Sequence, residues 1–173
     1  GGTISSEGTI KVQFTDAVGK ERKEDDMTSV FSIYPESEGT VKWLDDQTLE
    51  FDPTELLHSG VRYKGSVNLA ELMEVEAGYE LFEFNFRTIV KDFKVDIERF
   101  ATYNASDYSK QNLQGSLLFT DVIDSAEVVN LMTATQDGNA LQINFKKKSK
   151  YKWNFTVEDI LRKEKRSSLE LVW

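Results

Sequence analysis

The sequence predicts an all-β protein made of two tandem antiparallel β-sandwich domains, the second with one short helix. Short runs of alternating apolar and polar residues recur along the chain between clusters of turn-forming residues, which is typical of two-sheet sandwiches. Leu57, Gly60 and Tyr63 have the spacing of a sandwich corner, where a tyrosine hydroxyl bonds to backbone upstream. A change in charge along the chain indicates two folding units rather than one.

Charge separates the two predicted domains. Residues 1–90 contain 8 Lys+Arg against 18 Asp+Glu, whereas residues 91–173 contain 13 against 12. We therefore predict domains at 1–90 and 91–173, joined at Thr88–Asp92 without a flexible linker. The acidic first half argues against nucleic acid as a partner, because phosphate binding requires clustered positive charge.

The first domain is expected to be all-β. A charged loop over Gly19–Asp26 is expected between its first two strands, and Ala70–Glu76 reads as a loop or a single helical turn. Asp45, Asp46 and Gln47 form the polar turn of a hairpin. The predicted strands are Thr9–Phe14, Val30–Tyr34, the hairpin arms around Val41–Trp43 and Leu49–Phe51, Tyr63–Leu69 and Leu81–Arg87.

The second domain combines further strands with one helix. Asp124 and Ser125 can cap a helix over Ala126–Met132, because their side-chain oxygens accept the unpaired N–H groups of a first turn. Asp137-Gly138 is a tight-turn pair, since both residues tolerate positive φ. The predicted strands are Phe93–Glu98, Leu113–Phe119, Thr133–Thr135, Leu141–Phe145, Tyr151–Phe155 after a hairpin tip at Lys146–Lys150, and Ser168–Trp173.

Strand alternation also predicts the two hydrophobic cores. In the first domain we expect the core to consist of Phe14, Phe31, Trp43, Phe51, Leu57, Tyr63, Phe84 and Phe86. In the second we expect Val95, Ile97, Leu118, Leu141, Ile143, Phe145, Trp153, Phe155 and Leu171.

Composition narrows the class of protein further. The 173 residues are 39% hydrophobic and contain no cysteine, which favours a bacterial source or a core that needs no disulfide. No apolar run approaches the roughly 20 residues that span a bilayer, and no signal peptide is present. The chain begins Gly-Gly and ends in the strand-like LELVW, so we expect a fragment of a longer protein.

The residues that could carry chemistry have simpler structural interpretations. His58 is the only histidine and lies in a turn, so a solvated loop histidine is favoured over a general base. Asp45 and Asp46 lack the alternating spacing of an EF-hand calcium loop and are expected to serve the turn. The run Lys20–Asp26 mixes charges and is expected to be a solvated loop, with a contact surface as the alternative. We therefore predict no catalytic, cofactor-binding or metal-binding residues, no cofactor and no enzymatic activity.

A lysine-rich segment between two aromatic strands is the most prominent candidate for binding. Basic residues interleaved with aromatic ones can bind single-stranded nucleic acid or an acidic glycan. Alternation, however, directs Phe145, Trp153 and Phe155 to the core, and lysines at a hairpin tip discourage edge-to-edge pairing. We favour this structural interpretation. The basic residues are Lys146, Lys147, Lys148, Lys150 and Lys152, with Tyr151 among them.

Two tripeptides match the N-glycosylation pattern, Asn104-Ala-Ser106 and Asn154-Phe-Thr156. In a bacterial protein both are expected to be coincidental, and Asn154 lies within a predicted strand.

The order of the strand motifs resembles a known family. F-S-I-Y-P, G-T-V-K-W and L-L-H-S-G-V-R-Y resemble a bacterial surface Ig-like module. The whole succession is similar to the amino-terminal region of alpha-2-macroglobulin-family proteins from Bacteroides-type bacteria, with a similarity that covers nearly all of the chain. The motifs span Phe31–Pro35, Gly39–Trp43, Thr48–Pro53 (T-L-E-F-D-P), Leu56–Tyr63, Phe82–Ile89 (F-E-F-N-F-R-T-I), Asp92–Val95 (D-F-K-V) and Leu131–Gly138 (L-M-T-A-T-Q-D-G).

This resemblance implies an Ig-like sandwich at 1–90 and a macroglobulin-like sandwich at 91–173. Family members are exported, often lipid-anchored proteins that trap a protease after it cuts a bait segment, and many carry a Cys–Gln thioester. Without cysteine this chain cannot hold that thioester, and none of the family's reactive residues can be assigned to it.

The expected function is a non-catalytic structural fragment of such a protease-trapping protein in the bacterial cell envelope, periplasmic or at the cell surface. Its expected partners are the neighbouring domains of the same polypeptide, with proteases engaged only through the full-length protein and no membrane insertion by the fragment. The alternative is a cell-surface Ig-like binding module that recognises a glycan or a protein.

Overall fold

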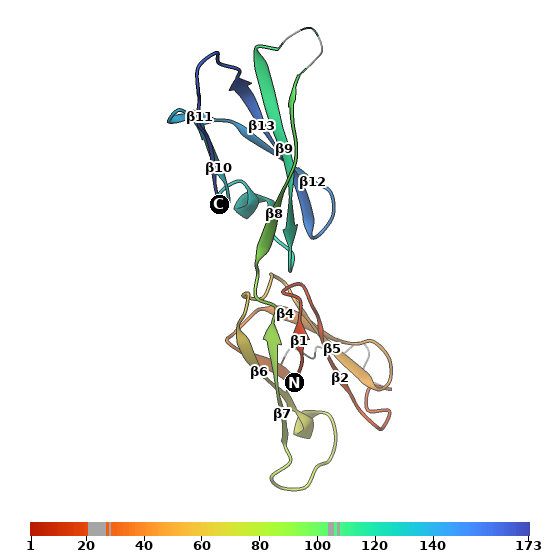
Figure 1. Cartoon of the computed structure of the whole chain (residues 1–173). Helices are drawn as coiled ribbons and strands as arrows, with labels where there is room; N and C mark the ends of the chain where they lie inside the picture. Colours follow the sequence, from red (N-terminus) through yellow and green to blue (C-terminus); the bar gives the residue numbers. More distant parts are fainter. Residues whose placement is uncertain (21–26, 28, 104–105, 107) are drawn as a thin grey trace. The chain divides into compact units, whose positions relative to one another are not determined.

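The computed structural model of the chain describes residues 1–20, 27, 29–103, 106 and 108–173. It consists of two compact units, Gly1–Val90 and Lys91–Trp173. The regular secondary structure of both units is almost entirely β-strand (Figure 1). The predicted all-β sandwich class is therefore confirmed.

The described residues of unit 1 form two sheets. One has the strand order β1-β7-β6-β3 and the other β2-β5-β4; β1 and β7 run parallel, and the other pairs given for these sheets are antiparallel. A 3₁₀ turn, η1 (Leu69–Glu71), lies where a loop or helical turn is expected. The strands are β1 (Thr3–Ile4), β2 (Ile10–Gln13), β3 (Phe31–Tyr34), β4 (Gly39–Trp43), β5 (Thr48–Pro53), β6 (Arg62–Asn68) and β7 (Leu81–Thr88).

The core of unit 1 is shared by both sheets, which makes the unit a sandwich. Residues at alternate positions of each strand point inward, because successive side chains of a strand face opposite sides of its sheet. Phe31 stacks on Phe51 across the two sheets at 5.0 Å between ring centroids. Six of the eight predicted core residues are buried, namely Phe31, Trp43, Phe51, Leu57, Tyr63 and Phe86, and Phe14 and Phe84 pack against them while partly buried.

The predicted corner is present in unit 1. The Tyr63 hydroxyl accepts a hydrogen bond of 2.9 Å from the backbone N–H of His58, five residues upstream. Leu57 is buried beneath this corner, and Gly60 adopts a φ of 70°, which glycine populates at little cost. The Tyr63 ring itself stacks on Phe86 at 5.1 Å. The tyrosine therefore links the loop before β6 to the core.

The described residues of unit 2 also form two sheets, with strand orders β12-β13-β9-β8 and β11-β10-β14. The strands are β8 (Phe93–Thr102), β9 (Lys110–Phe119), β10 (Thr133–Gln136), β11 (Asn139–Leu141), β12 (Ile143–Lys147), β13 (Lys152–Leu161) and β14 (Leu169–Val172).

The helix of unit 2 is shorter than predicted. It spans only Ser125–Val128 as α1, with Asp124 as its N-cap through a 2.8 Å bond from the Ala126 N–H. Two successive β-branched valines and then Asn130 disfavour further turns, because these residues have low helix propensity. The Asn130 side chain donates to the Ala126 carbonyl and so satisfies a helix-end acceptor.

The chain changes sheets after the Asp137-Gly138 turn. Both turn residues have positive φ, 49° and 80°, as the sequence predicts for a two-residue hairpin. The predicted strand Leu141–Phe145 is wrong as a single element, because Leu141 pairs with Ala134 in one sheet whereas Ile143 pairs with Val157 in the other.

Two of the predicted core residues of unit 2 are exposed. Leu118 is 49% exposed because its neighbour Leu117 takes the inward position on β9. Ile97 is 52% exposed, and it lies on the edge strand β8 beside a register shift between Ile97 and Arg99. Trp153 and Phe155 are buried as predicted, and Val95, Leu141, Ile143, Phe145 and Leu171 pack against the core while partly buried.

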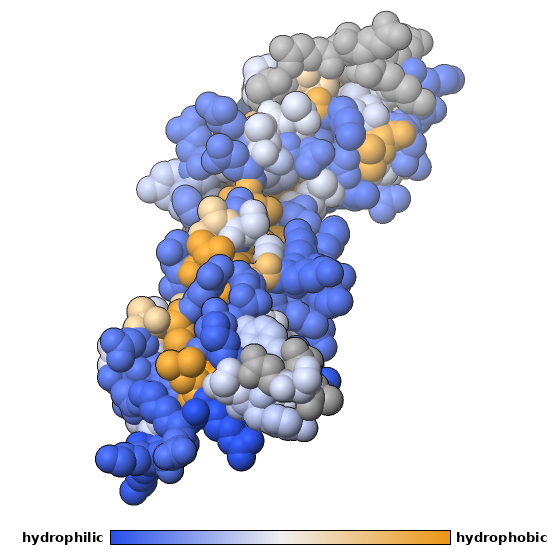
Figure 2. All heavy atoms as spheres, turned by 90° about the horizontal axis from the view of Figure 1, so that it is seen from above, coloured by the Kyte–Doolittle hydropathy of each residue, from blue (hydrophilic) through white to orange (hydrophobic). Residues whose placement is uncertain are grey.

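The face of the molecule drawn in Figure 2 is mostly hydrophilic. Blue hydrophilic residues cover most of the face in Figure 2, and orange hydrophobic residues gather in a few patches. None of the helices in the described part of the chain has both the length and the apolar character needed to span a membrane.

Candidate functional site

His58 serves the corner through its backbone, and its imidazole is exposed. Its N–H donates to Tyr63, and its carbonyl accepts a 2.5 Å hydrogen bond from the Thr88 hydroxyl. The same Thr88 oxygen accepts from the Val61 N–H at 3.0 Å. Thr88 is buried, so this hydroxyl connects the loop before β6 to the end of β7.

Asp45 and Asp46 hold the β4–β5 turn. The Asp45 carboxylate accepts from the Gln47 N–H at 2.7 Å and from the Thr48 hydroxyl at 3.0 Å. The Asp46 carbonyl accepts from the Gly19 N–H. Within residues 1–20, 27, 29–103, 106 and 108–173, no three His, Cys, Asp or Glu side chains lie close enough to hold a metal ion.

The lysine-rich hairpin presents its charges and the ring of Tyr151, but it buries the larger ring of Trp153. Trp153 is buried, and the Lys147 ammonium lies 5.8 Å from the centre of its ring. The Lys152 ammonium lies 3.7 Å from a carboxylate oxygen of Glu98. Only Tyr151 of the three aromatic residues nearest the tip is exposed. A stacking platform for bases is therefore not formed here.

Some sequence candidates cannot be placed. Within the run Lys20–Asp26 the structure describes only Lys20, and Asn104 and Ala105 of the first glycosylation pattern lie outside the described residues. Asn154 lies within β13, paired with Lys146 on one side and Ser116 on the other.

Two polar clusters were not anticipated from the sequence. Glu50 is buried on β5. Its carboxylate accepts a hydrogen bond of 3.0 Å from the Thr9 hydroxyl and forms ion pairs with the ammonium groups of Lys11, at 3.3 Å, and Lys42, at 3.4 Å. Burial alone would raise the pKa of the Glu50 carboxyl, but the bonds from Thr9, Lys11 and Lys42 outweigh it and keep the pKa below its ordinary value. The strand pairing that brings these side chains together has no local signature.

The second cluster surrounds Asp137 in unit 2. The Lys163 ammonium lies 2.5 Å from its carboxylate, and the Ser168 N–H and Ser167 hydroxyl also donate to it, at 2.8 and 2.9 Å. These three donors, Lys163 first, lower the pKa of Asp137 to about 2. The cluster anchors the β10–β11 turn to the segment before β14, which is a structural role.

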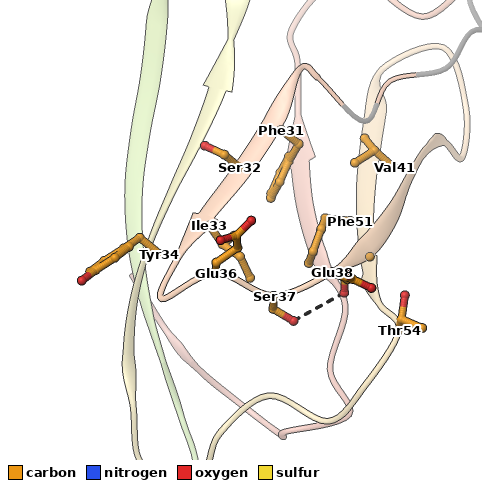
Figure 3. A pocket seen from close by; sticks show the side chains of 11 residues that line it. Phe31, Ser32, Ile33, Tyr34, Glu36, Ser37, Glu38, Val41, Phe51 and Thr54 are labelled. Atoms are coloured by element: carbon orange, nitrogen blue, oxygen red, sulfur yellow. Dashed lines mark hydrogen bonds between the residues drawn. The ribbon is translucent and has the colours of Figure 1, made fainter.

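An open groove lies along one side of unit 1, and we call it the β3–β4 groove. It is lined by β3, by Glu36–Gly39, and by Val41, Phe51 and Thr54, with a volume of about 610 Å³. Figure 3 shows Phe31 and Phe51 facing one another inside it and Tyr34 pointing away. β3 and β4 are the outermost strands of opposite sheets, so the groove is the open side of the sandwich.

The mouth of the β3–β4 groove is acidic. The exposed residues Glu36 and Glu38 line it, and they also line a second cavity of about 360 Å³ together with Glu55. The two cavities share Glu36, Ser37, Glu38 and Thr54 and are therefore adjacent. No lysine or arginine lines either cavity in the described part of the chain.

A scan of protein-family models finds none that matches this chain, and a search of curated protein sequences finds no match to it.

Proposed function

We propose that the chain is a non-catalytic, structural part of a bacterial alpha-2-macroglobulin-like protease-trapping protein, located in the periplasm or at the cell surface. Its partners are the neighbouring domains of the same polypeptide, and it meets proteases only through the full-length protein, which carries the lipid anchor. The fragment binds no cofactor or nucleic acid and does not enter the membrane.

One observation carries this proposal. Several polar side chains form hydrogen bonds that hold strands, turns and loops together. These are Thr88 and Tyr63 at the corner, Asp45 at the hairpin turn, and Asp137 at the β10–β11 turn. Polar side chains that hold their own fold together in this way suit an architectural role.

The placement of the motifs adds support. In unit 1, F-S-I-Y-P and G-T-V-K-W coincide with β3 and β4, T-L-E-F-D-P is β5, and L-L-H-S-G-V-R-Y forms the corner. The sheets β2-β5-β4 and β7-β6-β3 also have the strand order of an immunoglobulin-like sandwich.

The test uses the product of the complete reading frame that encodes this chain. After incubation with trypsin, we expect the product to be cut and to retain the protease, which then cleaves a small chromogenic peptide but not a large protein. Deleting residues 1–173 should leave the cut in place and lower the fraction of trypsin retained. A product that never retains trypsin, or one whose retention is unaffected by the deletion, would contradict the proposal.

A second candidate function is a surface module that binds another polypeptide. It is favoured by the β3–β4 groove, which combines an apolar floor with an acidic rim whose carboxylates have no partner among the described residues.

A further inference from the structure

We infer that the β3–β4 groove is a docking site for an extended peptide segment that carries lysine or arginine at alternate positions and pairs with the free edge of β3. This inference goes beyond the architectural role and deepens the second candidate function. It can hold whether or not the parent protein traps proteases.

The pairing register shows which backbone groups of β3 are free. The Asn68 N–H donates to the Val30 carbonyl, and the register continues with Phe31 opposite Val67 and Ser32 opposite Ser66. In an antiparallel pair hydrogen-bonded positions alternate, so Ser32 and Tyr34 bond to β6. The N–H and C=O groups of Phe31 and Ile33 therefore point away from β6, and no partner for them is present among the described residues.

On the opposite wall of the groove, β4 also has backbone groups that point away from its paired strand. The Leu44 N–H donates to the Thr48 carbonyl, and the Thr54 N–H donates to the Glu38 carbonyl. By the same alternation, the backbone groups of Gly39 and Val41 point away from β5. Such an edge is a template for strand addition, in which main-chain hydrogen bonds supply affinity and alternate side chains supply specificity.

The side chains along the groove define the occupant. An added strand would place every second side chain on the core side, beside Phe31 and Ile33, where apolar residues fit. The intervening side chains would lie on the side of Ser32 and Tyr34. Of the groove-lining residues, β3 supplies four consecutive ones, whereas β4 supplies only Gly39 and Val41. The segment is therefore assigned to the edge of β3.

The acidic rim of the groove favours positive charge on the peptide side chains that alternate with the apolar ones. Glu36 and Glu38 lie in the connection after β3, beyond Pro35, and Glu55 continues the acidic rim. Their carboxylates have no hydrogen-bond or ion-pair partner within the part of the chain that the structure describes. Three uncompensated carboxylates attract a cationic partner and repel an anionic one.

Acidic residues beside a free edge have an alternative role, since charge can protect an edge strand from aggregation. The two roles differ in whether a cationic strand binds. The probe is the peptide acetyl-Lys-Val-Lys-Val-Lys-Val-Lys-amide, titrated into the ¹⁵N-labelled 173-residue chain at low salt. At saturation we expect amide exchange to slow at least tenfold at Phe31 and Ile33 and to stay unchanged at Ser32 and Tyr34, which already bond to β6.

Matched variants separate charge from fold. Replacing Glu36, Glu38 and Glu55 by Gln should weaken binding of the peptide about tenfold, since exposed ion pairs each contribute modestly. The control replaces Glu74, Glu76 and Glu170 by Gln, three exposed residues outside both cavities. It changes the net charge equally and should bind the peptide as the unchanged chain does.

Peptide variants separate edge pairing from simple attraction. A Glu-Val peptide of the same length should not bind, and a Lys-Pro peptide, which lacks every second N–H, should bind at least tenfold more weakly. Absence of binding by the Lys-Val peptide would show that the carboxylates only protect the edge. Equal binding of the Lys-Pro peptide, or protection confined to Gly39 and Val41, would overturn pairing with β3. Protection of Phe31 and Ile33 by self-association without peptide, detected by sedimentation, would overturn the assignment of a cationic segment.

Discussion

The corner hydroxyl of unit 1 allows a test of one hydrogen bond with little change in packing. Tyr63→Phe removes only the oxygen that accepts from the His58 N–H at 2.9 Å. The ring is 1% exposed and stacks on Phe86, and both features persist in phenylalanine. The variant therefore leaves a backbone donor unpaired while the core stays filled.

The cost follows from the surroundings of that donor. An unsatisfied buried N–H costs about 1–3 kcal/mol. His58 and Tyr63 both line the cavity next to Glu55, so water can partly replace the lost acceptor, and we expect a value near the lower end, about 1.5 kcal/mol. For a unit of this size, that free energy corresponds to a fall in Tm of roughly 6–12 °C.

Differential scanning calorimetry of the full chain measures the fall in Tm, and amide exchange at His58 reports the bond itself. The control is Tyr34→Phe, the same chemical change at a side chain that is 75% exposed, for which we expect no shift. If Tyr63→Phe leaves both the Tm and the His58 exchange rate unchanged, the corner hydrogen bond does not stabilise the unit.

Three further predictions concern core packing and charge. Trp43→Ala should destabilise unit 1 by about 3–5 kcal/mol in urea unfolding, because it removes a large side chain that is only 6% exposed. The control Leu44→Ala, at an exposed neighbouring position, should destabilise the unit by less than about 0.5 kcal/mol. Gly115→Ala should lower the stability of unit 2 by about 1–3 kcal/mol, since a Cβ there would collide with the backbone of β8 and with the core ring of Phe155. Gly2→Ala, with open space around it, should change stability little in the same urea unfolding assay. Equal unfolding midpoints for the two variants would refute the packing argument. Because the pKa of Asp137 falls from 3.8 to about 2 on folding, its contribution to stability is present above pH 3.8 and is lost as the pH falls towards 2. The stability difference between the unchanged chain and Asp137→Asn should therefore shrink between pH 5 and pH 2, and a constant difference would exclude this carboxylate as the cause.

Local patterns anticipated most of the strands, but they could not resolve positions where two readings are locally equivalent. Leu117 and Leu118 are adjacent leucines, and only the pairing of β9 with its neighbours decides that Leu117 is buried. The strand β1 is two residues long and forms because β7 is beside it, so it leaves no periodic signal. The change of sheet between Leu141 and Ile143 is likewise a property of the assembled unit.

In the β3–β4 groove, local patterns predict the apolar residues but not the acidic ones. Phe31 and Phe51 were predicted as core residues and are buried, yet Glu36 and Glu38 carried no signal, because a short acidic connection between strands resembles any solvated loop. Their place at the mouth of a groove depends on β3 and β4 being the outermost strands of opposite sheets. Strand order is set by contacts between residues far apart in the chain, and no local pattern encodes it.

Local sequence patterns therefore suffice to predict the all-β class, the hairpin turns and the corner, because alternation, turn residues and the spacing of Leu57, Gly60 and Tyr63 act over a few residues. Three features follow from the assembled units alone: which strand edges stay open, which carboxylates have no partner among the described residues, and which of two neighbouring leucines is buried. These depend on how the strands are ordered and packed, and that is decided by the free energy of the whole unit rather than by any one segment.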